Sequence, residues 1–208
     1  MKKLATKKVL TLVSTLILAG FASFSQAQGN AAAGESKAAV CGACHGADGN
    51  SAVAANPKLA GQNARYLIKQ MNDIKSGART VPLMTGILNN SSAQDMADIA
   101  AYFESKEITL QGANPDLIET GEDIYRAGIA KLNVAACSAC HSPTGQGNSQ
   151  GGFPSLGGQH AEYTATQLRA FRAGERTNDG QSSPMRIVSE RLTDKEIEAL
   201  ASYISGLN

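Results

Sequence analysis

The chain has 208 residues, a formal net charge of +1 and only 5% aromatic residues, with no tryptophan. Beyond the first eight residues it carries no basic run, so the charge pattern argues against nucleic-acid binding. With so few aromatic residues the chain can form only a small hydrophobic core. Small domains usually need a metal, a disulfide or a cofactor for stability. The composition therefore favours a bound non-protein group.

Residues 1–27 are typical of a secretory signal peptide. Four lysines lie among the first eight residues, residues 9–24 are apolar or small without a charge, and Ser25-Gln26-Ala27 offers the small residues of a cleavage site. A membrane anchor is the alternative, but this apolar stretch is just short of a spanning helix and no positively charged stop sequence follows it. We therefore expect residues 1–27 to be removed and the mature protein to reside in the periplasm.

Two parts of the remaining chain resemble each other in the same order. The stretch "AVCGACHGADG" from Ala39 is matched by "ACSACHSPTG" from Ala136. The stretch "PKLAGQNARYLIKQMNDIKSGAR" is matched by "PSLGGQHAEYTATQLRAFRAGER", and "SSAQDMADIAAYF" by "LTDKEIEALASYI". Such ordered self-similarity indicates a duplicated unit of roughly 90 residues. The Gly-Asn-Pro stretch at 111–117 suits a linker, so we expect domains at 28–110 and 118–208.

Both units are predicted to be helical. Apolar residues recur at helical spacing after Ser92 and after Thr193, and an acidic residue stands three positions beyond each, as at a helix N-terminus. A second pair of amphipathic helices is expected at 64–75 and 161–172. Neither unit has the alternating β-branched residues of strands. The predicted fold class is therefore all-α, with two small domains.

All four cysteines lie in two Cys-x-x-Cys-His motifs, one in each unit: Cys41, Cys44 and His45, then Cys137, Cys140 and His141. A dithiol oxidoreductase would need one such motif beside a βαβ unit. Paired zinc motifs usually lie about 15 to 20 residues apart, far closer than these. Structural disulfides suit an exported protein, but they would leave both histidines unexplained.

The Cys-x-x-Cys-His pattern is the attachment motif of c-type haem. Its two thiols add to the two vinyl groups on one edge of the porphyrin, which brings the adjacent histidine under the iron. One match could arise by chance, whereas two matches that consume every cysteine of an exported chain are specific. We therefore predict two covalently bound haem c groups, with His45 and His141 as proximal iron ligands.

The other axial ligand of each iron is expected to be methionine. Methionine and histidine are the usual candidates, but His160 has no counterpart because Asn63 takes its place in the first unit. Met84 and Met185 occupy matching loop positions, each after a proline and before a capped helix. Filling a gap in the core is the alternative role for such residues. The pattern predicts His45/Met84 and His141/Met185 ligation.

The other methionines near these segments are expected in the core. Met71 aligns with Leu168 and Met96 with Ile197, on the apolar faces of predicted helices. Their apolar counterparts in the second unit could not ligate iron.

Two prolines are candidates for supporting the proximal histidines. A ligating histidine usually donates its other ring N–H to a fixed acceptor. Pro57 and Pro154 follow His45 and His141 by 12 and 13 residues, and each opens a similar turn. Their backbone carbonyls are therefore plausible acceptors, with a plain turn as the alternative.

Each unit resembles a class I cytochrome c domain, with Cys-x-x-Cys-His near an N-terminal helix, a Pro-x-Leu-x-Gly turn, a methionine loop and a C-terminal helix. Two such units behind a signal peptide, with "KLAGQNARYL", "DIAAYF", "GGQHAEYTATQLRAFRAGERTNDG" and "ALASYISGL", resemble the cytochrome c4 family over nearly all of the mature chain. The resemblance implies two domains related by a pseudo-twofold axis, with haem propionates near their interface. It also implies a periplasmic electron carrier between a quinol-oxidising cytochrome bc complex and a terminal oxidase.

An iron with six strong ligands has no open position for a substrate, so we expect an electron carrier rather than an enzyme. A di-haem peroxidase would need a displaceable ligand at one iron, whereas both units have a matched methionine. A permanently bound haem subunit of a dehydrogenase complex stays open as an alternative. We expect a monomer with redox protein partners, no small-molecule substrate and at most a loose association with the membrane surface.

Overall fold

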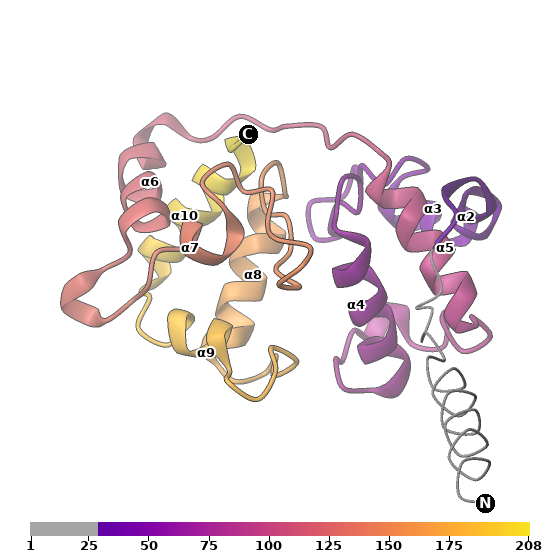
Figure 1. Cartoon of the computed structure of the whole chain (residues 1–208). Helices are drawn as coiled ribbons and strands as arrows, with labels where there is room; N and C mark the ends of the chain where they lie inside the picture. Colours follow the sequence, from indigo (N-terminus) through magenta and orange to yellow (C-terminus); the bar gives the residue numbers. More distant parts are fainter. Residues whose placement is uncertain (1–28) are drawn as a thin grey trace, which may run out of the picture.

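The computed structural model describes residues 29–208, so the predicted signal peptide at 1–27 lies outside the described residues. The described chain forms two helical lobes that lie side by side and are joined by one extended segment (Figure 1). The first lobe contains α2 (Ala31–Lys37), α3 (Ala39–His45), α4 (Ala64–Ser76), the 3-10 helix η1 (Pro82–Met84) and α5 (Ala93–Glu104). The second contains η2 (Pro115–Leu117), α6 (Ile118–Ala127), η3 (Ala130–Leu132), α7 (Ser138–His141), α8 (Ala161–Arg172), α9 (Pro184–Ser189) and α10 (Asp194–Gly206).

The all-α prediction is confirmed. Over residues 29–208 the β-pairing is limited to two isolated bridges, Ile129 with Val134 and Asn148 with Phe153. The helices expected at 64–75 and 161–172 are α4, which runs one residue further, and α8, which has the predicted bounds.

Capping side chains fix where the last helix of each lobe begins. Ser92 accepts a hydrogen bond from the backbone N–H of Asp95 at the start of α5, and Thr193 accepts one from Glu196 at the start of α10. Both acidic side chains bond back to the cap residue, so each helix starts with the predicted capping box.

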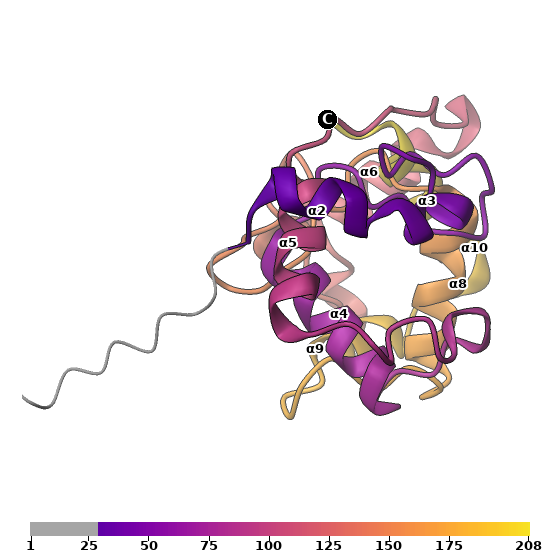
Figure 2. The same cartoon turned by 90° about the vertical axis from the view of Figure 1, so that its right-hand side faces the viewer.

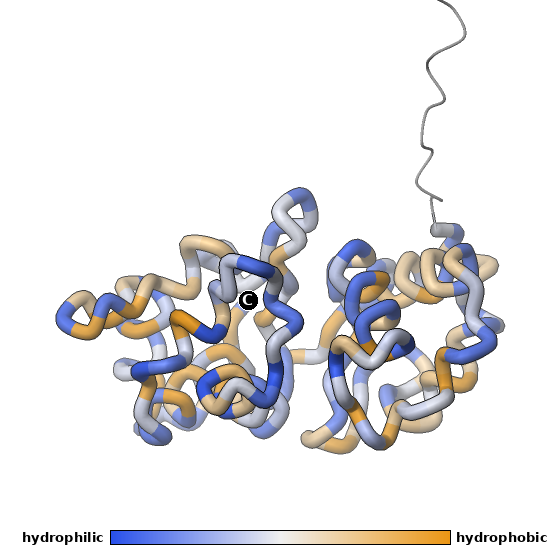
Figure 3. Tube along the Cα trace, turned by 90° about the horizontal axis from the view of Figure 1, so that it is seen from below, coloured by the Kyte–Doolittle hydropathy of each residue, from blue (hydrophilic) through white to orange (hydrophobic). Residues whose placement is uncertain are grey.

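The two lobes share one plan, in which the first helix crosses the last. In the first lobe α2 packs on α5, as Figure 2 shows, and in the second α6 packs on α10. A middle helix, α4 or α8, packs against the last helix of its own lobe. Seen from below, the lobes are distinct, and polar and apolar residues alternate along both (Figure 3).

The core of each lobe contains the methionine positions expected there. Met71 and Met96 are buried in the first core, and their aligned residues Leu168 and Ile197 are buried in the second. That prediction is confirmed. None of the helices within residues 29–208 is both long and apolar enough to cross a membrane.

A pair of glutamines joins the lobes symmetrically. The Gln62 amide donates to the Ser155 carbonyl and accepts from the Ser155 N–H, both at 2.8 Å. The Gln159 amide makes the same pair of bonds with the backbone of Lys58, both at 2.9 Å. Gln62 aligns with Gln159, and Lys58 with Ser155. Such exchange of equivalent contacts is the mark of a twofold interface, here a pseudo-twofold within one chain.

Candidate haem sites

Each Cys-x-x-Cys-His motif lies on a short helix. α3 carries Cys41 and Cys44, and Cys137 is the N-cap of α7, which carries Cys140. Residues three apart on a helix lie on the same face, so both thiols of a motif can meet one edge of a porphyrin. All four thiols are unbridged, and the two motifs lie in different lobes. This arrangement differs from a disulfide framework and from a single zinc site shared by both pairs.

Burial disfavours the thiolate form of the first cysteine in each motif. It raises the pKa of Cys41, and it raises the pKa of Cys137 to about 11. Dithiol oxidoreductases and zinc sites depend on the opposite shift, since the thiolate is their nucleophile or ligand. The local environment therefore disfavours both alternatives.

Both motif histidines are held by a hydrogen bond from the ring to a proline carbonyl. His45 Nδ1 donates to the carbonyl of Pro57 at 2.8 Å, and His141 Nδ1 donates to the carbonyl of Pro154 at 2.9 Å. Burial lowers the pKa of both rings, although the bonds to the carbonyls act in the opposite direction. A neutral ring that donates from Nδ1 keeps the lone pair on Nε2, the nitrogen then able to ligate iron.

The predicted proline carbonyls thus bond to these histidines as expected. Both rings are almost fully buried, with 7% of His45 and 5% of His141 exposed. Each ring is therefore fixed by packing and by one hydrogen bond, and the donor set fits a haem in both lobes.

Met84 and Met185 lie in short helices rather than in loops, which corrects the sequence expectation. Met84 ends η1 and Met185 is the second residue of α9. Pro82 and Pro184 are the first residues of these helices, where a proline fits because its missing N–H has no partner to lose.

The methionine and the first cysteine of each motif meet at the same core. Met84 and Cys41 both pack, partly buried, against the core of the first lobe. Met185 and Cys137 do so in the second lobe. Met84 also lines a cavity with Ile74. Methionine and motif therefore border the same core in both lobes, although about 40 residues separate them in sequence.

His160 belongs to the interface between the lobes. Only 3% of it is exposed, and its Nε2 lies 2.8 Å from the Ser51 carbonyl and its Nδ1 3.2 Å from Gln111 Oε1. Asn63, its counterpart, donates to the Phe153 carbonyl at 2.9 Å. The two aligned side chains each reach a carbonyl of the other lobe, which explains a polar residue at both positions.

In each lobe one tyrosine donates a hydrogen bond to the segment that follows the Cys-x-x-Cys-His motif. The sequence analysis did not identify either tyrosine. Tyr125 donates to the carbonyl of Ser142 at 2.6 Å, and Tyr102 donates to the carbonyl of Ala47 at 2.9 Å. The tyrosines come from α6 and α5, which are not equivalent helices. An alignment of the two units therefore pairs Tyr102 with Tyr203 and gives no sign of the role of Tyr125.

Comparison with known proteins places these sites in a family context. The Cytochrome c family model matches residues 31–107 and 118–208. The chain is 54% identical to cytochrome c4 of Pseudomonas aeruginosa, across 95% of this chain and 98% of that protein. The crystal structure of reduced recombinant cytochrome c4 from Pseudomonas stutzeri is similar, with a TM-score of 0.85 and 52% identity over 86% of this chain and all of that one. A thiosulfate dehydrogenase electron acceptor from Stutzerimonas stutzeri is 36% identical over 82% of this chain and 80% of that protein.

Proposed function

The chain belongs to the cytochrome c4 family, and we propose that it is a periplasmic di-haem electron carrier of a respiratory chain. It carries two covalently bound haem c groups. The observation that supports the proposal most directly is the repeated histidine geometry, in which His45 and His141 are each fixed by a proline carbonyl.

The residues proposed to bind the two haems come from equivalent positions of the two duplicated units. We assign the thioether bonds to Cys41, Cys44, Cys137 and Cys140, and axial ligation to His45 with Met84 and to His141 with Met185. The carbonyls of Pro57 and Pro154 orient the two histidines. The domains span residues 28–110 and 118–208 with a linker at 111–117, and residues 1–27 are the signal peptide.

In this role the bound haem supplies one electron at a time. The thioether bonds keep a small exported protein from losing its cofactor. With His45 or His141 and the matching methionine as its ligands, a bound haem iron would have no open position for a substrate, and methionine would favour a higher reduction potential than a second nitrogen ligand.

Exposed apolar side chains beside the methionines support exchange with protein partners. Leu83 precedes Met84 and is 83% exposed, and Ile187 lies two residues after Met185 and is 58% exposed. We propose that these surfaces meet a quinol-oxidising cytochrome bc complex as donor and a terminal oxidase as acceptor.

Permanent association with a dehydrogenase is the second candidate. The similarity to a thiosulfate dehydrogenase electron acceptor favours it. Purification from periplasm without detergent distinguishes the two, because a free carrier elutes as a monomer whereas a bound subunit elutes with its dehydrogenase.

Mass spectrometry tests the haem assignment. The mature chain should show two haem increments that survive acid–acetone extraction, and Cys137→Ala with Cys140→Ala should retain one. A single increment in the unmodified protein would contradict the proposal. Stopped-flow oxidation by a purified terminal oxidase then tests the carrier role.

A further inference from the structure

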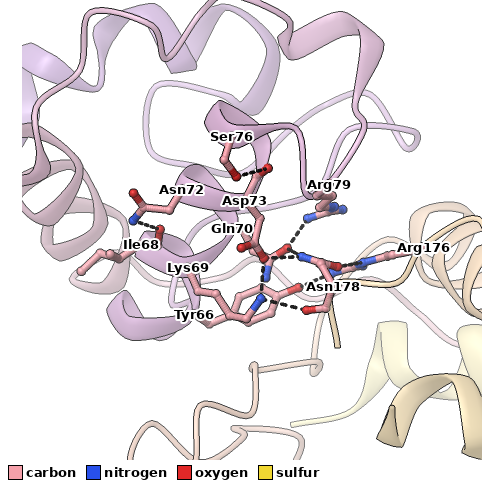
Figure 4. A network of polar contacts seen from close by, with 10 residues as sticks. All are labelled: Tyr66, Ile68, Lys69, Gln70, Asn72, Asp73, Ser76, Arg79, Arg176 and Asn178. Carbon is pink, nitrogen blue, oxygen red and sulfur yellow. Dashed lines mark hydrogen bonds and ion pairs between the residues drawn. The ribbon is translucent and has the colours of Figure 1, made fainter. Parts of the chain in front are cut away.

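The segment that precedes Met185 is anchored on the first lobe. Asn178 donates from Nδ2 to Asp73 Oδ2 at 2.6 Å and to Gln70 Oε1 at 3.0 Å, and both acceptors lie on α4. The backbone carbonyl of Asn178 accepts a hydrogen bond from Lys69 Nζ, also on α4, at 2.8 Å. Figure 4 shows Asn178 of the second lobe directed at these side chains. Residue 178 is therefore held on a helix of the other lobe through both its side chain and its backbone.

The residue after this anchor holds the backbone directly behind Met185. Asp179 accepts from the backbone N–H of Arg186 at 3.0 Å and from its Nε at 2.9 Å. That N–H belongs to the peptide unit joining Met185 to Arg186, so the carboxylate fixes the chain at the methionine. The Asp179 side chain is only 2% exposed. Because a buried carboxylate is strongly destabilising without its partner, this ion pair resists opening.

Ser183, two residues before Met185, has a strained backbone. Its φ of 49° and ψ of 41° lie in the left-handed region, which a serine rarely adopts. Arg186 Nη2 donates to Ser183 Oγ at 2.6 Å, and the N–H of Ile187 donates to its carbonyl at 3.0 Å. Such a conformation persists where the surrounding contacts over-determine it. Loss of the pair between Asp179 and Arg186 would let Ser183 relax, together with the start of α9 that carries Met185.

The methionine of the first lobe has no matching anchor. The 3-10 helix η1 has no capping side chain and is held by backbone hydrogen bonds, such as that from Met84 to Val81 at 2.9 Å. Thr85 follows Met84 where Arg186 follows Met185, so the arginine that binds Asp179 has no counterpart. Leu83, directly before Met84, is 83% exposed. The two methionine segments therefore differ in how firmly they are held, although the lobes share one plan.

We propose that Asp179 is a positioning residue for Met185, and that docking of the first lobe, through Asn178, holds this methionine in place as a ligand of the second haem. Asp179 acts through Arg186 rather than as a ligand. The first haem, whose Met84 segment lacks the anchor, exchanges its methionine more readily. The inference rests on the axial ligands proposed above and adds a role for the contact between α4 and the segment before α9.

The test measures how readily imidazole displaces each methionine from the ferric holoprotein. Imidazole is a suitable ligand for iron, and each displacement removes half of the weak iron–sulfur absorption band. In the wild type we expect two phases, the first from Met84 and the second, at higher imidazole concentration, from Met185. Met185→Ala should lack the second phase, which assigns it to the second haem.

Variants of the anchor should move the second phase alone. Asp179→Ala should shift it to an imidazole concentration lower by about tenfold, and Asn178→Ala should shift it in the same direction by a smaller factor. Arg65→Gln is the matched control, because Arg65 also crosses the interface, to the Gln150 carbonyl at 2.7 Å, but contacts a segment that carries no methionine. It should leave both phases unchanged. An equal shift in Arg65→Gln and Asn178→Ala would overturn the inference, because any weakening of the interface would then suffice.

Asp179→Asn covers the case in which the alanine variant does not fold. It keeps the shape of the side chain and removes its charge, so the second phase should shift by a smaller factor than in Asp179→Ala. A second phase at its wild-type position in the Asp179 and Asn178 variants would contradict the positioning role. A single phase in the wild type would also contradict it, since the two methionines would then be equally exchangeable.

The spectrum of Met185→Ala keeps this inference apart from the assignment of the axial ligands. If that variant retains the whole iron–sulfur band, the proposed ligand itself is wrong. If it loses half of the band while the Asp179 variants titrate like the wild type, the ligand stands and only the positioning role fails.

Discussion

Gly34 passes so close to Asp98 that a Cβ atom on the glycine would lie 2.0 Å from the Asp98 carbonyl oxygen. Gly121 makes the matching approach to Ala199 in the second lobe, where the distance would be 2.3 Å. Each lobe therefore depends on one glycine where its first helix crosses its last. Backbone can approach backbone so closely only where no side chain intervenes.

Gly34→Ala should destabilise the first lobe and Gly121→Ala the second. The new methyl group meets backbone, which cannot move aside as a side chain can, so we expect a loss of about 3 kcal/mol in the free energy of unfolding of that lobe. Gly112→Ala is the control, because a Cβ there meets nothing within 4 Å. Thermal unfolding followed by circular dichroism measures the effect, and a Gly34→Ala transition at the wild-type temperature would contradict the close approach.

Asp98 should contribute to the acid stability of the first lobe. Lys37, at 2.6 Å, the Asn30 N–H and Gln94 lower the pKa of Asp98 to about 2. The unfolded carboxyl has a pKa of about 3.9, so the stabilisation is complete above about pH 4 and is lost as pH falls toward 2.

Asp98→Asn should therefore lower the melting temperature at neutral pH and flatten its fall between about pH 4 and pH 2. The exposed Asp116→Asn is the control and should follow the wild type. The measurement is a series of melts against pH. An Asp98→Asn curve parallel to the wild type would show that this carboxylate carries no linked stability.

The sequence correctly predicted helix bounds and helix caps, which depend on residues close together in the chain. α8 begins at Ala161 and ends at Arg172 as its apolar periodicity indicates, and Ser92 and Thr193 cap the helices that follow them. The hydrogen bonds from His45 to Pro57 and from His141 to Pro154 also agree with the sequence expectation, because the duplicated units repeat nearly the same spacing, 12 and 13 residues. The short helices at the two methionines were missed, since three to six residues give too little periodicity to recognise.

The contacts between lobes could not be read from the sequence. Gln62, Tyr66, Gln70 and Arg79 are identical in the second unit, which marks them as more than surface residues. Nothing in a linear pattern says that equivalent residues meet across a pseudo-twofold axis, since this depends on how the lobes dock. His160 had no explanation for the same reason.

Methionine variants test the proposed axial ligands. Met84→Ala and Met185→Ala should each remove about half of the weak iron–sulfur absorption band at the red edge of the visible spectrum, because each iron contributes one such bond. Met71→Ala is the control, since Met71 is buried in the core. It should keep the whole band while losing about 2–5 kcal/mol of stability. Loss of half the band in Met71→Ala instead would mean that the repeat alignment assigns the wrong residue.

The paired glutamines should control whether the lobes unfold together. Gln62→Ala leaves the N–H and carbonyl of Ser155 without partners, and Gln159→Ala does the same to Lys58. Unpaired polar groups at such sites cost about 1–3 kcal/mol, so each variant should weaken docking by a similar amount. Calorimetry should then resolve two transitions where the wild type has one, whereas the exposed Gln146→Ala should keep a single transition. Equal losses from the two variants would reflect the pseudo-twofold relation, and a loss from only one would show that the interface is energetically one-sided.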